Sequence, residues 1–134
     1  MKKDKWIWMP HPGHFICSFD CRFHLSTYVG KYIVSTVGEY FPCDGTREII
    51  AKSRGIELKG RGDERKYDFL NKIGYEEIGC DRKYETMVFE AYKDTKNKCC
   101  PYRMSGSEKD FAGYNDPTDA FKGHMKLCLK WSKK

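Results

Sequence analysis

The stretch CRFHLSTYVGKYIVSTVGEYF, residues Cys21 to Phe41, gives the clearest secondary-structure signal in this chain. Two runs rich in Tyr, Val, Ile, Thr and Phe flank the dipeptide Gly30-Lys31. Aromatic and β-branched residues favour strands, and glycine at the first central position is what a type II′ two-residue turn requires. The stretch therefore predicts a β-hairpin over about residues 22–41.

A two-residue loop also predicts the pairing of the hairpin, because each step outward from the turn joins the next two residues. Successive side chains alternate between the two faces of a sheet. One predicted face carries the mainly apolar set Phe23, Leu25, Thr27, Val29, Tyr32, Val34, Thr36 and Gly38. The other carries a cation, an imidazole, two hydroxyls and a carboxylate, from Arg22, His24, Ser26, Ser35 and Glu39. We interpret the first face as the core side and the second as either a solvated surface or a polar ligand site.

The rest of the chain predicts further elements around the hairpin. Short strands are expected over Trp6–Met9 and Tyr84–Tyr92, and helices over 47–53, capped by Thr46, and 64–73, capped by Asp63. In the second helix the apolar stripe is Tyr67, Leu70 and Ile73. Residues 105–115 are expected to form a loop.

Asp116-Pro117 is a strong start signal for a last helix to about Trp131, because aspartate caps helices and proline is favoured at the first helical position. Phe121, His124, Cys128 and Trp131 fall on one face of that helix. The fold class expected is α+β, a mostly antiparallel sheet built on the hairpin and packed against two or three helices.

The size and composition of the chain indicate one globular domain over residues 1–134. Hydrophobic residues make up 40% of the chain and charged residues 33%, and no run approaches the ~18 apolar residues that a membrane-spanning helix needs. The N-terminus, MKKDKWIWMPHPG, has the basic start of a signal peptide without its continuous apolar core. We therefore expect a cytoplasmic protein with no membrane partner.

The formal net charge of +6 favours an anionic partner, such as nucleic acid, a nucleotide or an acidic protein surface. Lysines and arginines are scattered, with a local excess at the two termini and at Lys59-Gly60-Arg61. The charge alone does not select among these partners.

Cysteine and histidine positions suggest a zinc site. The chain has seven cysteines, which in a reducing compartment are core thiols, metal ligands or nucleophiles more often than disulfides. His124 and Cys128 lie four residues apart in the predicted last helix and so project from one side. Cys17 with Cys21, or Cys99 with Cys100, could complete a tetrahedral site. The competing interpretation is that His124 and Cys128 are ordinary core residues.

Sequence motifs for cysteine or histidine catalysis are weaker than the pattern that suggests a zinc site. No motif of a cysteine hydrolase surrounds Cys17, Cys21 or Cys43. A two-histidine phosphoesterase would need a second motif to match His24-Leu25-Ser26, and His124-Met125-Lys126 does not supply it. A zinc-dependent or histidine-based hydrolase acting on nucleotides or nucleic acid is the alternative to a binding protein, and a zinc-stabilised structural adaptor is a third interpretation.

The strings WIWMPHPGHFIC, CRFHLSTYVGKYIVSTVGEYFP, RKYETMVF, CCPY and GHMKLCLKW span most of the chain. Together they resemble a family of small uncharacterised proteins encoded by phages and prophages, which brings no assigned activity. The resemblance implies an accessory protein of a phage that acts by binding in the host cytoplasm, for example by inhibiting a defence factor or by sequestering a nucleotide signal.

We therefore expect a phage-type, counter-defence binding protein rather than an enzyme. The predicted ligand-binding residues are Arg22, His24, Ser26, Ser35 and Glu39, with Arg82 and Lys83 beside Tyr84 as helpers. The predicted metal ligands are Cys17, Cys21, His124 and Cys128, with zinc as the cofactor. The sequence leaves open the identity of the ligand and whether the protein is a homo-oligomer.

Overall fold

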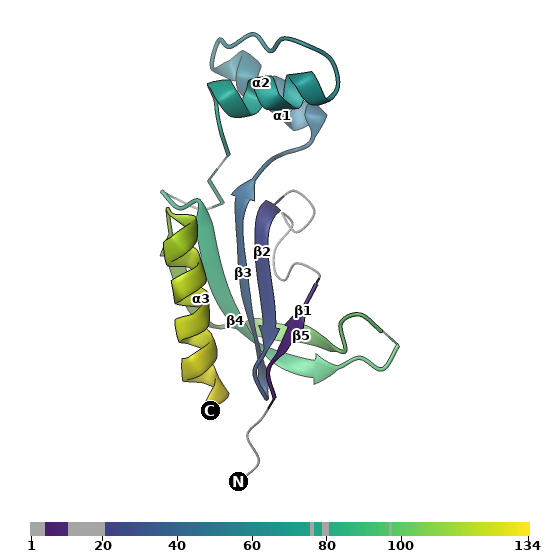
Figure 1. The fold of residues 1–134 in the computed structure, drawn as a ribbon, viewed down its shortest axis with the longest axis vertical. Helices are drawn as coiled ribbons and strands as arrows, with labels where there is room; N and C mark the ends of the chain where they lie inside the picture. Colours follow the sequence, from purple (N-terminus) through teal and green to yellow (C-terminus); the bar gives the residue numbers. More distant parts are fainter. Residues whose placement is uncertain (1–4, 11–20, 76, 79–80, 97) are drawn as a thin grey trace.

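The computed structural model describes residues 5–10, 21–75, 77–78, 81–96 and 98–134. Along this part of the chain the elements are β1 (Ile7–Met9), β2 (Cys21–Tyr28), β3 (Tyr32–Tyr40), α1 (Asp44–Ser53), α2 (Asp63–Lys72), β4 (Tyr84–Lys93), β5 (Tyr102–Tyr114) and α3 (Pro117–Ser132). The strands form one antiparallel sheet in the order β1-β2-β3-β4-β5, which confirms the α+β class. Figure 1 shows α3 along one face of the sheet and the pair α1 and α2 beyond its end.

Strands β2 and β3 form the predicted hairpin in the predicted register. The Val29 N–H donates to the carbonyl of Tyr32 at 2.9 Å, which closes the loop at Gly30-Lys31. Gly30 has a φ of 98°, a conformation that side chains with a Cβ rarely adopt. Because this turn fixes the pairing, Thr27 lies opposite Val34 as predicted.

Helix α3 packs on the predicted core face of the hairpin. Val29, Val34 and Val88 from the sheet form a buried cluster with Leu127 and Cys128 from α3. Burial of these apolar side chains is the main force that holds the helix to the sheet. The cluster confirms which side of the hairpin faces the core.

The start of α3 is also as predicted, although one residue of its expected buried face is exposed. The Asp116 carboxylate accepts the backbone N–H groups of Thr118 and Asp119, at 2.8 and 3.1 Å. His124 and Cys128 are fully buried, whereas the Phe121 side chain is 50% exposed. The sheet covers the stripe of Ala120, His124 and Leu127, and Phe121 lies at its margin.

The loop predicted over residues 105–115 is wrong, because most of that segment belongs to β5. Tyr84 pairs with Tyr114, and Lys93 pairs with Tyr102 at the far end of the ladder. β5 is an edge strand that leaves much of its surface exposed, so its sequence need not alternate between apolar and polar residues. The strand conformation of β5 depends on backbone pairing with β4. The local sequence of β5 has no pattern that indicates this pairing.

Helices α1 and α2 share a cluster of buried side chains with the end of β3. Its buried members are Phe41, Ala51, Leu58 and Phe69. Leu70 and Ile73 of the predicted stripe pack against this cluster, but Tyr67 is 66% exposed and was wrongly included, whereas Phe69 is fully buried. The buried stripe is rotated around the helix because Phe69 packs edge-on against Phe41, with ring centroids 5.7 Å apart.

Both helices begin a little earlier than predicted. Cys43, not Thr46, occupies the N-cap position of α1, and its side chain makes no capping hydrogen bond. Asp63, predicted as the cap of α2, is instead its first residue. Arg47 in the first turn of α1 is buried, where its guanidinium donates to the Pro42 carbonyl and pairs with Asp44. These contacts tie α1 to the segment that follows β3.

Candidate functional site

The polar face predicted for the hairpin is largely covered. Ser26 and Ser35 expose 4% and 0% of their surface. The adjoining β4–β5 hairpin lies partly over this side, and its Tyr102 ring stacks on Tyr28 with centroids 3.7 Å apart. Arg22 is exposed, with its guanidinium carbon 4.8 Å from the centre of the Phe41 ring, and His24 is half-buried.

Glu39 is drawn away from the other members of the predicted set. Its φ of 53° breaks the regular strand geometry, and its Oε2 accepts a hydrogen bond from the Tyr84 hydroxyl at 3.0 Å. Tyr84 is a buried residue whose ring lies over Gly38 on the core face. Burial, and then the bond to Glu39, raise the pKa of the Tyr84 hydroxyl. The Glu39 carboxylate therefore acts as a partner of the core face in this structure.

Arg82 lies against β5, whereas Lys83 lies between β3 and β5, because its carbonyl accepts the Glu39 N–H at 3.3 Å. The Arg82 guanidinium carbon is 4.6 Å from the centre of the Phe111 ring of β5, and its side chain covers Gly113, where a Cβ would be 1.9 Å from Cδ. Lys83 is exposed, and its backbone N–H donates to Oδ1 of Asn115 at 3.0 Å. The structure thus does not gather the seven predicted ligand-binding residues into one surface, and their role stays a prediction.

His124 lies at the centre of a buried polar network between α3 and the sheet. Its Nε2 is 2.8 Å from Oγ1 of Thr27, and its Nδ1 is 2.6 Å from Oγ1 of Thr36. Thr36 in turn lies 2.6 Å from the Thr86 hydroxyl. Burial lowers the pKa of His124 to about 4, so the imidazole is neutral near pH 7. One ring nitrogen then donates and the other accepts, and both are satisfied by threonines.

The predicted metal ligands share part of this buried region. Cys128 is fully buried one turn after His124, and burial raises the pKa of its thiol to about 12. Cys21 is buried in a different cluster, beside Val37. Among the residues that the structure describes, no three His, Cys, Asp or Glu side chains are grouped so as to hold a metal ion. Cys17 lies outside those residues, so the zinc site stays a prediction.

The outward side of α3 carries a basic surface, of which the sequence analysis noted only the local excess of basic residues at the C-terminus. Between Ala120 and Lys134 the chain has five lysines and no acidic residue. We call the exposed residues Phe121, Lys122, Lys126, Leu129 and Lys133 the lysine face of α3. Lys122, Lys126, Leu129 and Lys133 recur every three or four residues, and this helical period was the available signal.

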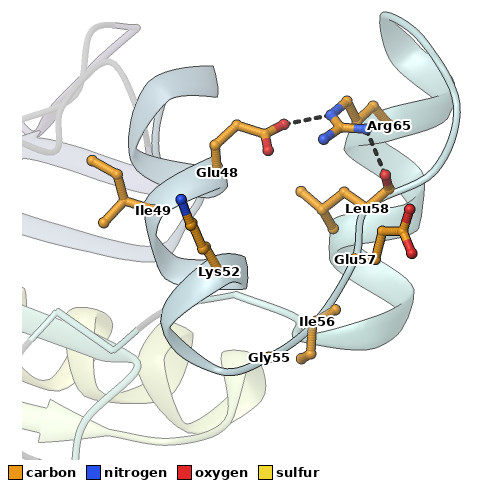
Figure 2. Close-up of a pocket in the computed structure, with 8 residues that line it drawn as sticks. All are labelled: Glu48, Ile49, Lys52, Gly55, Ile56, Glu57, Leu58 and Arg65. Carbon is orange, nitrogen blue, oxygen red and sulfur yellow. Dashed lines mark hydrogen bonds and ion pairs between the residues drawn. The ribbon is translucent and has the colours of Figure 1, made fainter.

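Helices α1 and α2 border an open groove of about 470 Å³. Figure 2 shows its lining, which consists of Glu48, Ile49, Lys52, Gly55, Ile56, Glu57, Leu58 and Arg65. The Arg65 guanidinium pairs with Glu48 and donates to the Leu58 carbonyl, and the hydrogen bond from Arg65 lowers the pKa of Glu48. The groove has two carboxylates and two cations, so its charge does not favour an anion over a cation.

Comparison with protein-family models, curated proteins and solved structures finds no match for this chain. Its resemblance to phage-encoded proteins therefore stays a prediction. No helix in the described part of the chain is long and apolar enough to cross a membrane.

Proposed function

We propose that the protein is a non-catalytic binding protein and that its partner is an acidic protein surface, bound by the lysine face of α3. The observation that carries this proposal is the placement of Lys122, Lys126 and Lys133 on the exposed side of the helix. Lys130 is also exposed, but it pairs with Asp110 at 2.9 Å. The lysine face therefore places three exposed lysines on one side of a helix whose segment, Ala120 to Lys134, has no acidic residue.

Two exposed apolar side chains favour a protein partner over nucleic acid. Phe121 is 50% exposed and Leu129 is 53% exposed, and both belong to the lysine face. Buried apolar anchors surrounded by charged residues are typical of protein interfaces.

The buried state of His124 favours binding over the alternative, a histidine-based hydrolase. A general base must come within hydrogen-bond reach of its substrate, and His124 exposes none of its surface. Both of its ring nitrogens already contact threonine hydroxyls.

In this proposal the protein acts in the host cytoplasm, which is the context that the phage resemblance implies.

The test compares two charge-reversal variants of equal net charge. K122E/K126E alters the lysine face, and K93E/K96E alters two exposed lysines at the end of β4 and in the loop after it. The probe is a synthetic acidic amphipathic helix made of Glu and Leu, titrated calorimetrically in low and physiological salt. We expect K122E/K126E to weaken binding about tenfold or more and K93E/K96E to leave it within about twofold.

Circular dichroism of both variants checks that the fold is retained. Peptide binding that is equal in the two variants would overturn the assignment to α3. Tighter binding of single-stranded DNA than of the peptide would replace the protein partner with nucleic acid.

A further inference from the structure

Cys99 and Cys100 place two sulfur atoms side by side in the segment before β5. Their Sγ atoms are 3.4 Å apart. Cys99 is exposed, whereas Cys100 is 8% exposed and packs with Met9 and Ile33. One thiol of the pair thus faces solvent while the other is anchored in the core.

We propose that Cys99 and Cys100 form a dithiol site that chelates a soft, thiophilic cation. Thiolates are soft ligands that select ions of this kind. This site is distinct from the lysine face of α3, because it lies in the β4–β5 hairpin. It does not depend on the proposed function.

The spacing of the two sulfur atoms fits chelation better than a bond between them. A disulfide requires an S–S distance of about 2.05 Å, so the sulfurs would have to approach by more than 1 Å. Two sulfur ligands of a tetrahedral ion, each about 2.3 Å from the metal, lie about 3.8 Å apart. The observed 3.4 Å is within a small side-chain rotation of that value.

The surrounding hairpin holds the two cysteines in place. The Asp94 N–H donates to the Pro101 carbonyl at 2.7 Å, which closes the loop around them. The Asp94 carboxylate pairs with Arg103 at 2.6 Å, and Tyr102 stacks on Tyr28. These contacts anchor the chain at Asp94 and directly after Cys100, which reduces the conformational entropy lost when both sulfurs bind one ion.

Phenylarsine oxide is a suitable probe, since its trivalent arsenic reacts with paired thiols. Two arsenic–sulfur bonds form, the arsenic–oxygen bond breaks, and the oxygen leaves as water with the two thiol protons. Arsenic remains trivalent, and no oxidant or reductant is needed. The adduct of a chelating pair resists a monothiol such as glutathione and is removed by a small dithiol.

The experiment treats the full chain and the variants C99S, C100S and C43S with phenylarsine oxide and follows the adduct by native mass spectrometry. Cys43 is the matched control, because it is exposed and has no cysteine beside it in the sequence. We expect the parent and C43S to keep one glutathione-resistant adduct, and C99S and C100S each to lose it.

C99S keeps the test decisive if C100S, which alters a buried residue, fails to fold. A glutathione-resistant adduct that persists in C99S would overturn the proposal, because arsenic would then be held by other thiols. Loss of the adduct in C43S would overturn it as well. None of the three cysteine variants alters α3, so the result of this experiment is independent of the acidic-peptide titration that tests the proposed function.

Discussion

Oγ1 of Thr36 lies 2.6 Å from Nδ1 of His124, so a hydroxyl of β3 and the imidazole of α3 meet inside the core. Both residues are fully buried. The contact joins positions 88 residues apart in the chain. It makes the docking of α3 depend on a polar bond as well as on apolar packing.

Acidification should therefore destabilise the fold through His124. The pKa of its imidazole is about 4 in the folded protein and near 6.5 when the chain is unfolded. The stabilisation is fully present above pH 6.5, where both states are neutral, and it is lost as the pH falls toward 4, because the unfolded state binds the proton first. We expect this group to lower the free energy of unfolding by about 3 kcal/mol over that range, as measured by urea titration. A His124→Leu variant that keeps the same pH dependence would contradict the assignment.

Removal of the Thr36 hydroxyl should cost stability without changing the shape of the core. Thr36→Val leaves the Thr86 hydroxyl and the His124 ring without their shared partner. A buried polar group left unsatisfied costs about 1–3 kcal/mol. The control is Thr36→Ser, which keeps the hydroxyl and should be less destabilising. Equal stability of the valine variant and the parent in urea would show that the contact contributes nothing.

Gly38 should tolerate no side chain. A Cβ at this position would lie 2.2 Å from Cδ1 of Tyr84 and 2.8 Å from the backbone oxygen of Lys83. Gly38→Ala should therefore lower the free energy of unfolding by at least about 1–3 kcal/mol, the usual cost of overpacking. Gly45→Ala in α1 is the matched control, because nothing lies within 4 Å of its Cβ and alanine favours a helix. A gain or no change in stability at both positions would contradict the packing around Tyr84.

Two aromatic residues of α2 should respond oppositely to truncation. Phe69 is fully buried against Phe41, whereas Tyr67 points largely into solvent. Phe69→Ala should cost about 3–5 kcal/mol, and Tyr67→Ala should change the free energy of unfolding by less than about 0.5 kcal/mol. Thermal unfolding monitored at the helical signal measures both effects. A large loss in the Tyr67 variant would mean that this side chain contacts something beyond the described residues.

Features fixed by local chemistry could be predicted from the sequence. The dipeptide Gly30-Lys31 specified the hairpin register, because loop length alone sets the pairing of the two strands. Asp116-Pro117 specified the start of α3, because the cap and the proline act on adjacent backbone groups. In both cases the decisive residues are neighbours in the chain.

Features that depend on distant contacts could not be predicted. β5 is a strand because β4 pairs with its two parts, Tyr102 to Ser105 and Asp110 to Tyr114, on either side of a register shift, and the sequence of β5 carries no strand pattern that reports this pairing. The partners of His124 depend on how α3 lies across β2 and β3. The positive φ of Glu39 turns its carboxylate toward Tyr84, and a count along an ideal strand places it beside Arg22 instead.

The insertion of α1 and α2 between β3 and β4 has an evolutionary consequence. These two strands are hydrogen-bonded neighbours, with Gly38 opposite Tyr84 at the point where the insertion leaves the sheet. In topological terms, residues 41–83 are the loop of one long antiparallel hairpin. Loop closure entropy changes slowly with length, so homologues could lengthen, shorten or replace this segment while the strand order is preserved. We expect sequence and length to diverge fastest here, and the sheet with α3 to be the inherited part of the fold.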